Sequence, residues 1–230
     1  MDNILEYDSV SIKYKQNTVI DNVSFDLKPG EILGIVGESG SGKSTILKSI
    51  NRILGDEAKI VSGQIRFNDA NLLTKSEKEM RTIRGRSIGM IFQDSIGSLC
   101  PIRTIGSQMI ETMRAHQKID KKQAKEKAMG LFGVLNFKDP EKLWKSYPFE
   151  LSGGMNQRVG IALGMIMNPA LLLADEPTSA LDIKSTGLVV DELKSLRKNF
   201  GTSIIIVSHD MDLMEGICDR IVEIKSGKVI

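Results

Sequence analysis

The sequence predicts an α/β fold with a mixed-sheet core, an N-terminal antiparallel β subdomain and an inserted helical subdomain. Short, nearly all-apolar runs recur along the chain, which is typical of strands buried on both faces of a parallel sheet. Partly alternating apolar residues near the N-terminus indicate antiparallel strands. A central stretch rich in Lys, Ala, Met and Gln has apolar residues at helical spacing and indicates the helices.

Length and composition exclude a disordered chain and a collagen-like chain. The chain has 230 residues, of which 41% are hydrophobic, 26% charged and 5% aromatic, so it can bury the core of one large domain or of one domain with an insert. Subtracting 29 acidic from 31 basic residues leaves a net charge of +2, with no run of five like charges, and so nothing indicates a nucleic-acid partner. Cys100 and Cys218 do not form a paired metal-binding motif, and we expect two reduced thiols.

Two antiparallel strands are predicted to open the chain. Their apolar residues alternate in part on either side of Lys15-Gln16-Asn17, and they are Leu5, Tyr7, Val10 and Ile12, then Val19, Ile20, Val23, Phe25 and Leu27. Pro29-Gly30 marks the next turn, and the apolar run 32–36 then predicts a strand buried on both faces. A glycine-rich turn and a helical stretch from Lys43 onward complete a strand, loop and helix.

Further strands are predicted over 63–67 and 87–92, the second of them buried. Residues 102–136 are predicted to form a mainly helical insert, because apolar residues recur there at helical spacing: Met109, Met113, Ala124, Ala128, Leu131 and Leu135. The runs 171–174 and 203–207 predict two more buried strands, each followed at once by acidic or polar residues. Because ligands of parallel α/β sheets bind at the carboxyl ends of the strands, we expect the chemistry at these positions.

A phosphate-binding loop is predicted between the strand 32–36 and the following helix. The pattern G-x-x-x-x-G-K-[ST] is matched by Gly37-Glu38-Ser39-Gly40-Ser41-Gly42-Lys43-Ser44, with Thr45 next in the helix. Backbone N–H groups of such a loop and the positive end of the helix dipole hold a polyphosphate. Lys43 would meet the β and γ phosphates, and Ser44 would coordinate Mg²⁺. The alternative, a glycine-rich turn that only joins strand to helix, leaves the Lys-Ser pair in register unexplained.

A second apolar strand ends in two acids that suit the same chemistry. Asp175 stands at the tip of the run 171–174, where it would hold Mg²⁺ through its water shell. Glu176 follows it and would polarise a water molecule for in-line attack on the γ phosphate. Two surface acids that cap a strand are the alternative. Small GTPases, helicases and kinases of small molecules share these two features, so they alone do not select a family.

The segment 151–158 is more selective. Leu151-Ser152-Gly153-Gly154-Met155-Asn156-Gln157-Arg158 opens an amphipathic helix just before the acidic strand. Ser152 is a good N-cap, and Gly153 and Gly154 expose backbone N–H groups, so this is a second anion-binding helix terminus. An ordinary loop and cap is the alternative.

With these residues the chain resembles the ATP-binding cassette (ABC) ATPases, in which 151–158 would be the signature motif. Further landmarks of that family occur in order: Tyr14 at the adenine-stacking position, Gln93 at the Q-loop glutamine, Ser179-Ala180-Leu181-Asp182 at the D-loop and His209 at the switch histidine. The resemblance covers essentially the whole chain. It implies a P-loop NTPase of the ABC ATPase type that binds ATP and Mg²⁺.

The resemblance also implies roles for these residues. Lys43, Gln93, Glu176 and His209 would be catalytic, and Ser44, Gln93 and Asp175 would hold the metal. His209 would keep the γ phosphate and the attacking water in line, and Gln93 would sense the γ phosphate at the hinge to the insert. One ABC ATPase domain over 1–230 is expected, with a catalytic core of 1–93 and 158–230 and a helical subdomain of 94–157.

Two copies of such a subunit pair head to tail in the family, and each ATP lies between the phosphate loop of one and the signature helix of the other. Ser152, Gly153 and Gly154 would then contact the partner's nucleotide, and Asp182 would shape the interface. Both a homodimer and a heterodimer agree with the sequence.

Variable segments resemble the oligopeptide, dipeptide and nickel importer branch, in particular 92–94, 98–101 and 152–159. Cys100 replaces the asparagine usual before Pro101, and Asn156 replaces a basic residue common after the signature methionine. The chain stops at Ile230, where many relatives of this branch extend further, which indicates a short member or a trimmed chain. Peptide, nickel and metal-chelate substrates all remain open.

A membrane complex is therefore the expected setting. The longest apolar stretch, 160–174, is broken by Asn168-Pro169 and is too short to cross a bilayer, and the N-terminus has no secretory signal. We expect a peripheral protein on the cytoplasmic face of the cell membrane, bound to permease subunits and served by an extracytoplasmic solute-binding protein.

Other ABC classes fit less well. Ribosomal proteins usually carry two cassettes, and chromosome or repair proteins a long coiled coil, whereas this chain shows one cassette and no sustained heptads. A degenerate regulatory cassette would lack Lys43, Glu176 or His209, and exporters commonly fuse membrane spans to the cassette.

Overall fold

The antiparallel sheet forms as the alternating pattern predicts. In the computed structural model, which describes residues 3–95, 97–179 and 181–230, β1 (Leu5–Tyr14) pairs with β2 (Asn17–Leu27) and with β4 (Ala58–Phe67), and β5 (Ala70–Asn71) completes the order β2-β1-β4-β5. Ile12 stands opposite Ile20 on one side and Ile60 on the other. The predicted strand 63–67 is the second half of the longer β4.

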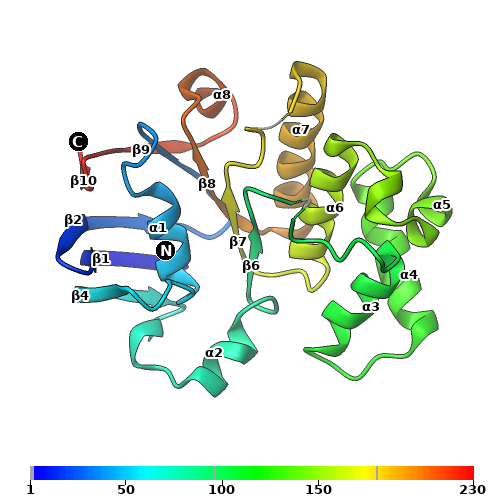
Figure 1. Cartoon of the computed structure of the whole chain (residues 1–230), viewed down its shortest axis with the longest axis horizontal. Coiled ribbons are helices and arrows are strands. Elements are labelled where there is room, and N and C mark those ends of the chain that lie inside the picture. Colours follow the sequence, from blue (N-terminus) through cyan, green and yellow to red (C-terminus); the bar gives the residue numbers. More distant parts are fainter. Residues whose placement is uncertain (1–2, 96, 180) are drawn as a thin grey trace.

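A six-stranded mixed sheet forms the centre of the molecule (Figure 1). Its strands are β3 (Ile32–Val36), β6 (Ile88–Ile91), β7 (Leu171–Asp175), β8 (Ser203–Ser208), β9 (Arg220–Lys225) and β10 (Lys228–Val229), in the order β10-β9-β3-β8-β7-β6. All neighbours are parallel except the pair of β9 and β10. Every residue of β3, β7 and β8 is buried, which confirms the expectation from their apolar runs.

The two sheets are held together by helix α1 (Lys43–Ile50). Its residues Ile46, Leu47 and Ile50 are fully buried in a cluster that draws side chains from both sheets. The helix is short, and it starts where the glycine-rich loop ends. This packing fixes the loop against the carboxyl end of β3.

The helical insert lies on the side of the central sheet away from the antiparallel sheet (Figure 1). The predicted region 102–136 contains α3 (Ile105–Arg114) and α4 (Lys121–Val134), and α5 (Pro140–Lys145) follows. The six apolar residues predicted to face inward there are all buried. Helix α6 (Gly153–Met165) runs without a break through the expected subdomain limit at residue 157.

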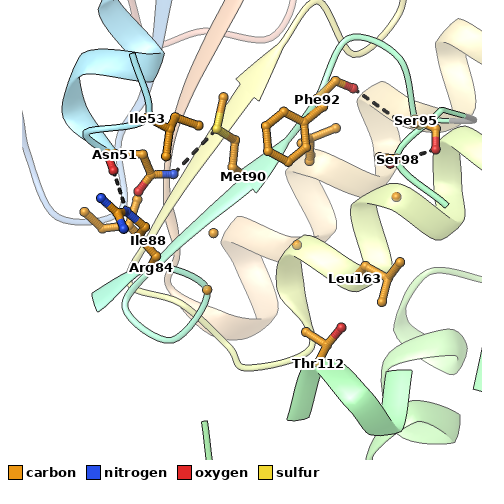
Figure 2. A pocket seen from close by; sticks show the side chains of 15 residues that line it. Asn51, Ile53, Arg84, Ile88, Met90, Phe92, Ser95, Ser98, Thr112 and Leu163 are labelled. Atoms are coloured by element: carbon orange, nitrogen blue, oxygen red, sulfur yellow. Dashed lines mark hydrogen bonds between the residues drawn. The ribbon is translucent and has the colours of Figure 1, made fainter. Parts of the chain in front are cut away.

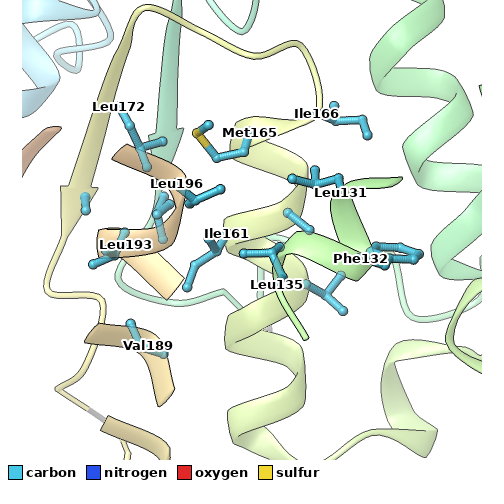
Figure 3. Packing of buried hydrophobic residues seen from close by; sticks show 14 of the residues in the cluster. Leu131, Phe132, Leu135, Ile161, Met165, Ile166, Leu172, Val189, Leu193 and Leu196 are labelled. Carbon is cyan, nitrogen blue, oxygen red and sulfur yellow. The ribbon is translucent and has the colours of Figure 1, made fainter. Parts of the chain in front are cut away.

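A second apolar cluster binds the insert to the core. Figure 3 shows Leu131 and Leu135 of the α4 region, Ile161 of α6 and Leu193 of α7 (Ile183–Phe200) packed together. The remaining short elements are η1 (Leu72–Thr74), α2 (Glu77–Ile83), η2 (Pro148–Glu150) and α8 (Met211–Glu215). No helix of the described residues is both long and apolar enough to cross a membrane. Both cysteines carry free thiols, as predicted.

Candidate functional site

Four adjacent parallel strands bring part of the predicted residues to one edge of the central sheet. In the order β3-β8-β7-β6, the strands are followed by the glycine-rich loop, by His209, by Glu176 and by Gln93. Asp175 is the last residue of β7. Segments that are far apart in sequence therefore meet at the carboxyl ends of the strands, as the apolar runs predicted.

The glycine-rich loop needs glycine at two of its positions. Gly37 has a φ of +152°, and a Cβ atom there would lie 2.1 Å from the carbonyl oxygen of Ile224. Gly42 has a φ of +105° and directly precedes α1, and a Cβ atom there would lie 2.5 Å from the Cδ1 atom of Ile20. The loop therefore fits tightly between β2 and β9, and only glycine permits this path.

Lys43 lies at the first turn of α1 with its side chain folded over the loop. Its Nζ atom donates to the carbonyl oxygens of Gly37 and Glu38, at 2.8 Å each, and the residue is only 5% exposed. The ammonium group is thus held at the concave face of the loop. A phosphate group bound there would offer the ammonium group charged oxygen acceptors in place of the two carbonyl oxygens, and hydrogen bonds to charged acceptors are stronger.

Ser44 and Asp175 come together as a candidate Mg²⁺ site. The Ser44 hydroxyl donates to Oδ1 of Asp175 at 2.7 Å, although the two residues belong to α1 and β7. Burial raises the pKa of Asp175 above its ordinary value, against the opposing effect of the Ser44 hydrogen bond. The described residues contain no group of three or more acidic, His or Cys side chains that could hold a metal alone. A hydroxyl and one carboxylate fit Mg²⁺, which keeps several waters and takes further oxygens from substrate phosphates.

Glu176 and His209 form the second pair of the site. The Nδ1 atom of His209 lies 2.8 Å from Oε2 of Glu176, and the backbone N–H of Glu176 donates to the carbonyl oxygen of Val207 at 3.0 Å. Glu176 has a φ of +48°, which is uncommon outside glycine and aims its side chain away from the course of β7. The glutamate side chain is 13% exposed and the imidazole 61%, so the pair has a sheltered carboxylate and an open ring.

A hollow of about 190 Å³ lies between these groups. Its lining combines predicted residues with one that was not predicted, and consists of Val19, Ser39, Gly40, Gly42, Lys43, Ser44, Thr45, Gln93 and Glu176. Val19 carries no signal in the sequence, because only the packing of β2 against the loop brings it here. Tyr14 is not among the lining residues; it is half-buried against the core of the antiparallel sheet.

The segment predicted as a signature motif does open a helix. Ser152 is the N-cap of α6, and its Oγ atom accepts from the backbone N–H of Met155 at 3.3 Å. Ser152 and Gly153 are exposed, and neither lines the hollow at the glycine-rich loop. Asn156 is buried and donates to the carbonyl oxygen of Pro148 at 3.0 Å, so it fastens the preceding loop to the helix.

Asp182 is the N-cap of α7. Its carboxylate accepts from the backbone N–H of Ser185 at 3.0 Å and from the Ser185 hydroxyl at 2.8 Å, and these bonds lower its pKa. The starts of α6 and α7 touch, since a Cβ atom on Gly154 would lie 3.0 Å from the Ser185 hydroxyl. Ala180, part of the predicted D-loop, lies outside the described residues.

A groove lies directly beyond Gln93 between the core and the helical insert. Figure 2 shows its core wall, with Asn51 and Met90, and its helical wall, with Thr112 of α3 and Leu163 of α6. Its volume is about 290 Å³, and Phe92 at its upper end is 45% exposed.

Comparison with known proteins agrees with this geometry. Residues 20–179 match the family model described as ABC transporter. The chain is 40% identical over 232 residues to the oligopeptide transport ATP-binding protein OppD of Bacillus subtilis, covering 99% of this chain and 65% of that protein. It is 40% identical to a probable peptide ABC transporter ATP-binding protein of Sinorhizobium fredii, covering 92% of this chain and 63% of that one. It is 37% identical to the metal-staphylopine import system ATP-binding protein CntD of Staphylococcus aureus, covering 96% and 82%.

Solved structures resemble the whole fold. The dimeric ATP-binding cassette MJ0796 in a post-hydrolysis state with ADP and Pi superposes with a TM-score of 0.85 at 28% identity, covering 98% of this chain and 96% of that one. CbiO1 of Clostridium perfringens, part of an ABC transporter complex, gives 0.87 at 28% identity, covering 100% and 88%. The chain spans 63–65% of the length of the two peptide-system relatives. With the strand order, the phosphate loop and the acidic strand end already in place, these matches show that the chain belongs to the ABC transporter family.

Proposed function

We propose that this chain is the ATP-hydrolysing, nucleotide-binding subunit that powers solute import through a membrane ABC transporter. The observation that carries the proposal is the pair of Glu176 and His209 beside the phosphate loop. A carboxylate within hydrogen-bond distance of an imidazole, near a buried lysine, can support water attack on a phosphoryl group.

Each residue of the candidate site then has a defined role in ATP hydrolysis. Lys43 and the loop N–H groups hold the β and γ phosphates, and Ser44 with Asp175 holds Mg²⁺, which neutralises phosphate charge when bound. Glu176 accepts a proton from water as the water oxygen bonds to the γ phosphorus. The bond between that phosphorus and the β–γ bridging oxygen breaks, which leaves ADP and phosphate. His209 orients Glu176 and the water, Gln93 would help Ser44 and Asp175 to hold Mg²⁺, and Tyr14 stacks on the adenine.

A second ATPase subunit is needed to complete the site. Ser152, Gly153 and Gly154 offer anion ligands, but in the single chain Ser152 and Gly153 are exposed and away from the hollow of Lys43. We infer that they contact the nucleotide of a partner subunit, identical or homologous, and that Asp182 lies at the interface. ATP then joins the two subunits and its hydrolysis releases them, which converts chemistry into motion.

Ser152→Asp, made in the Glu176→Gln background that is expected to bind ATP without hydrolysing it, tests the two-sided site. Aspartate caps a helix as well as serine does, so α6 should stay intact, but its charge would face the γ phosphate bound by the partner. We expect normal ATP affinity in the monomer and no ATP-dependent dimer, measured by nucleotide titration and by light scattering. Ser152→Asn, which caps equally well without charge, is the matched control and should dimerise. Equal dimerisation of both variants would contradict the assignment.

The groove beyond Gln93 supports a membrane partner. It lies between the central sheet and helices α3 and α6, so a segment bound there would contact both walls and respond to a movement of one against the other (Figure 2). We infer that permease subunits dock at this groove, which makes the chain a peripheral protein of the cytoplasmic membrane face. The solute is of the peptide or metal-chelate class, in keeping with OppD and CntD, and an extracytoplasmic binding protein delivers it.

Filling the groove should uncouple transport from ATP binding. Thr112 faces the groove from α3, and Thr112→Trp would occupy much of its 290 Å³. We expect ATP binding to persist while co-purification with the permease subunits is lost, together with uptake of the solute. Thr112→Val, which keeps the side-chain volume, should behave as the unchanged protein. Normal complex formation by the tryptophan variant would exclude this groove as the docking site.

A further inference from the structure

Arg158 of the signature helix joins three separate parts of the molecule. Its Nε atom donates to Oε1 of Glu192 in α7 at 2.5 Å, and its Nη2 atom donates to the carbonyl oxygen of Leu135 just after α4. The guanidinium group also lies over the ring of Phe137, 4.3 Å from its centroid. One planar side chain therefore fixes α6 against α7 and against the segment that follows α4.

The carboxylate of Glu192 is deeply buried, although other residues of α7 are exposed. The side chains of Arg158 and Glu192 are 12% and 4% exposed, and Oε2 of Glu192 has no hydrogen-bond partner among the described residues. Burial raises the pKa of Glu192 to about 7, although the guanidinium of Arg158 opposes this. A buried pair of this kind adds little net stability compared with apolar residues of the same volume. Net stabilisation is therefore a weak explanation for the buried pair of Arg158 and Glu192, whereas its position between α6 and α7 suits a role in holding the two helices at a fixed angle.

The two helices it joins carry the groups that would face the partner subunit. Ser152 caps α6 and Asp182 caps α7, and the helices already touch near these ends at Gly154 and Ser185. The ion pair lies about 9 Å from Ser152 along α6 and about 15 Å from Asp182 along α7, at 1.5 Å per residue. Contacts at two separate points fix the angle between two helices, whereas a single contact leaves it free.

Close packing surrounds the pair on one side only. The pair borders a cavity of about 830 Å³ whose apolar walls come from α6, α7 and residues 135–151, namely Leu135, Phe137, Leu143, Leu151, Met155 and Leu188. The apolar contacts of Figure 3 lie in the adjoining cluster, which includes Ile161 and Leu193. The ion pair thus lies between the packed cluster and the cavity, and adds a polar contact between α6 and α7 on the side that faces the starts of the two helices.

We propose that Arg158 and Glu192 are positioning residues that set the signature end of α6 relative to the start of α7, and so the fit of Ser152 to the nucleotide of the partner subunit. The inference rests on the proposed two-sided site. It concerns ATP-driven pairing, so the affinity of the single subunit for ATP should not depend on the pair.

The test replaces both charges by apolar side chains in the Glu176→Gln background. Arg158→Met with Glu192→Leu keeps the volume and should fold with an unchanged or higher melting temperature. We expect its monomer to bind ATP as the parent does but to need about tenfold more ATP for half-maximal dimerisation, equivalent to about 1.4 kcal/mol. Glu192→Gln keeps an acceptor for Nε of Arg158 and should restore dimerisation to within about twofold of the parent.

The outcomes separate the two proposals. A Glu176→Gln parent that stays monomeric with ATP and Mg²⁺ overturns the two-sided site and the positioning role with it. A parent that dimerises, together with an apolar variant that dimerises at the same ATP concentration, overturns the positioning role alone. If the apolar variant does not fold, Arg158→Lys decides: its ammonium can meet Glu192 but not Leu135 and Phe137 at once, and unchanged dimerisation would again refute the proposal.

Discussion

Glu176→Gln should lower the rate of ATP hydrolysis by about 10³-fold, which is within the usual contribution of a general base. Glutamine keeps the size of the side chain and its hydrogen bond to His209, but it cannot take a proton from water. The positive φ at residue 176 is unaffected, since both residues meet the same backbone cost. Phosphate release under single-turnover and steady-state conditions measures the effect.

The same variant should bind ATP normally and remain paired. Because hydrolysis opens the dimer in the proposed cycle, blocking it should trap a dimer in ATP and Mg²⁺ that light scattering detects. ADP in place of ATP is the control, and it should leave the subunits apart. A variant that hydrolyses ATP at the normal rate would remove Glu176 as the base. One that is inactive but never pairs, with itself or a homologous subunit, would leave the base in place and refute the shared site.

The nature of the sequence signals explains what could be predicted. Apart from Ser203, the runs 32–36, 171–174 and 203–207 are apolar, which is typical of strands buried on both faces, and all three became central strands. The carboxyl ends of parallel strands meet at one edge of the sheet. Strand order alone therefore brings Lys43, Glu176 and His209 together, and no side-chain contact had to be predicted. The meeting of these side chains at one edge of the sheet was therefore predictable from strand type and motif position.

Contacts that depend on packing between distant elements had no such signal. Val19 is one apolar residue among many in β2, and only the docking of the antiparallel sheet puts it in the hollow of the loop. In the sequence, Glu192 has the character of a surface residue on an amphipathic helix. In the structure its side chain is 4% exposed, because it faces α6 and bonds to Arg158 of that helix. Helix α2 is different: Ser76 and Glu79 form a capping box, a start signal that was readable in the sequence.

Lys43→Ala should raise the dissociation constant for ATP by about 10²-fold, because about 3 kcal/mol is typical of a lost charged hydrogen bond in a sheltered site. The ammonium group is buried and already bonded to the loop, and Lys43 is the one basic residue among the described residues that line the hollow. Isothermal titration with ATP and Mg²⁺ gives the affinity, and turnover should fall with it.

The nucleotide series distinguishes a lost phosphate contact from a damaged loop. Lys43 also holds the carbonyl oxygens of Gly37 and Glu38, so its removal could loosen the loop itself. Lys43→Met keeps the aliphatic volume and serves as the matched control for packing. If the ammonium acts on the β and γ phosphates, both variants should lose affinity for ATP while AMP binds as weakly as before. If instead the loss of these two hydrogen bonds loosens the loop, the melting temperature of both variants should drop, because methionine cannot donate to the carbonyl oxygens either. Full activity in both variants would refute the phosphate-loop assignment, since nothing else in the described site carries a buried positive charge toward the phosphates.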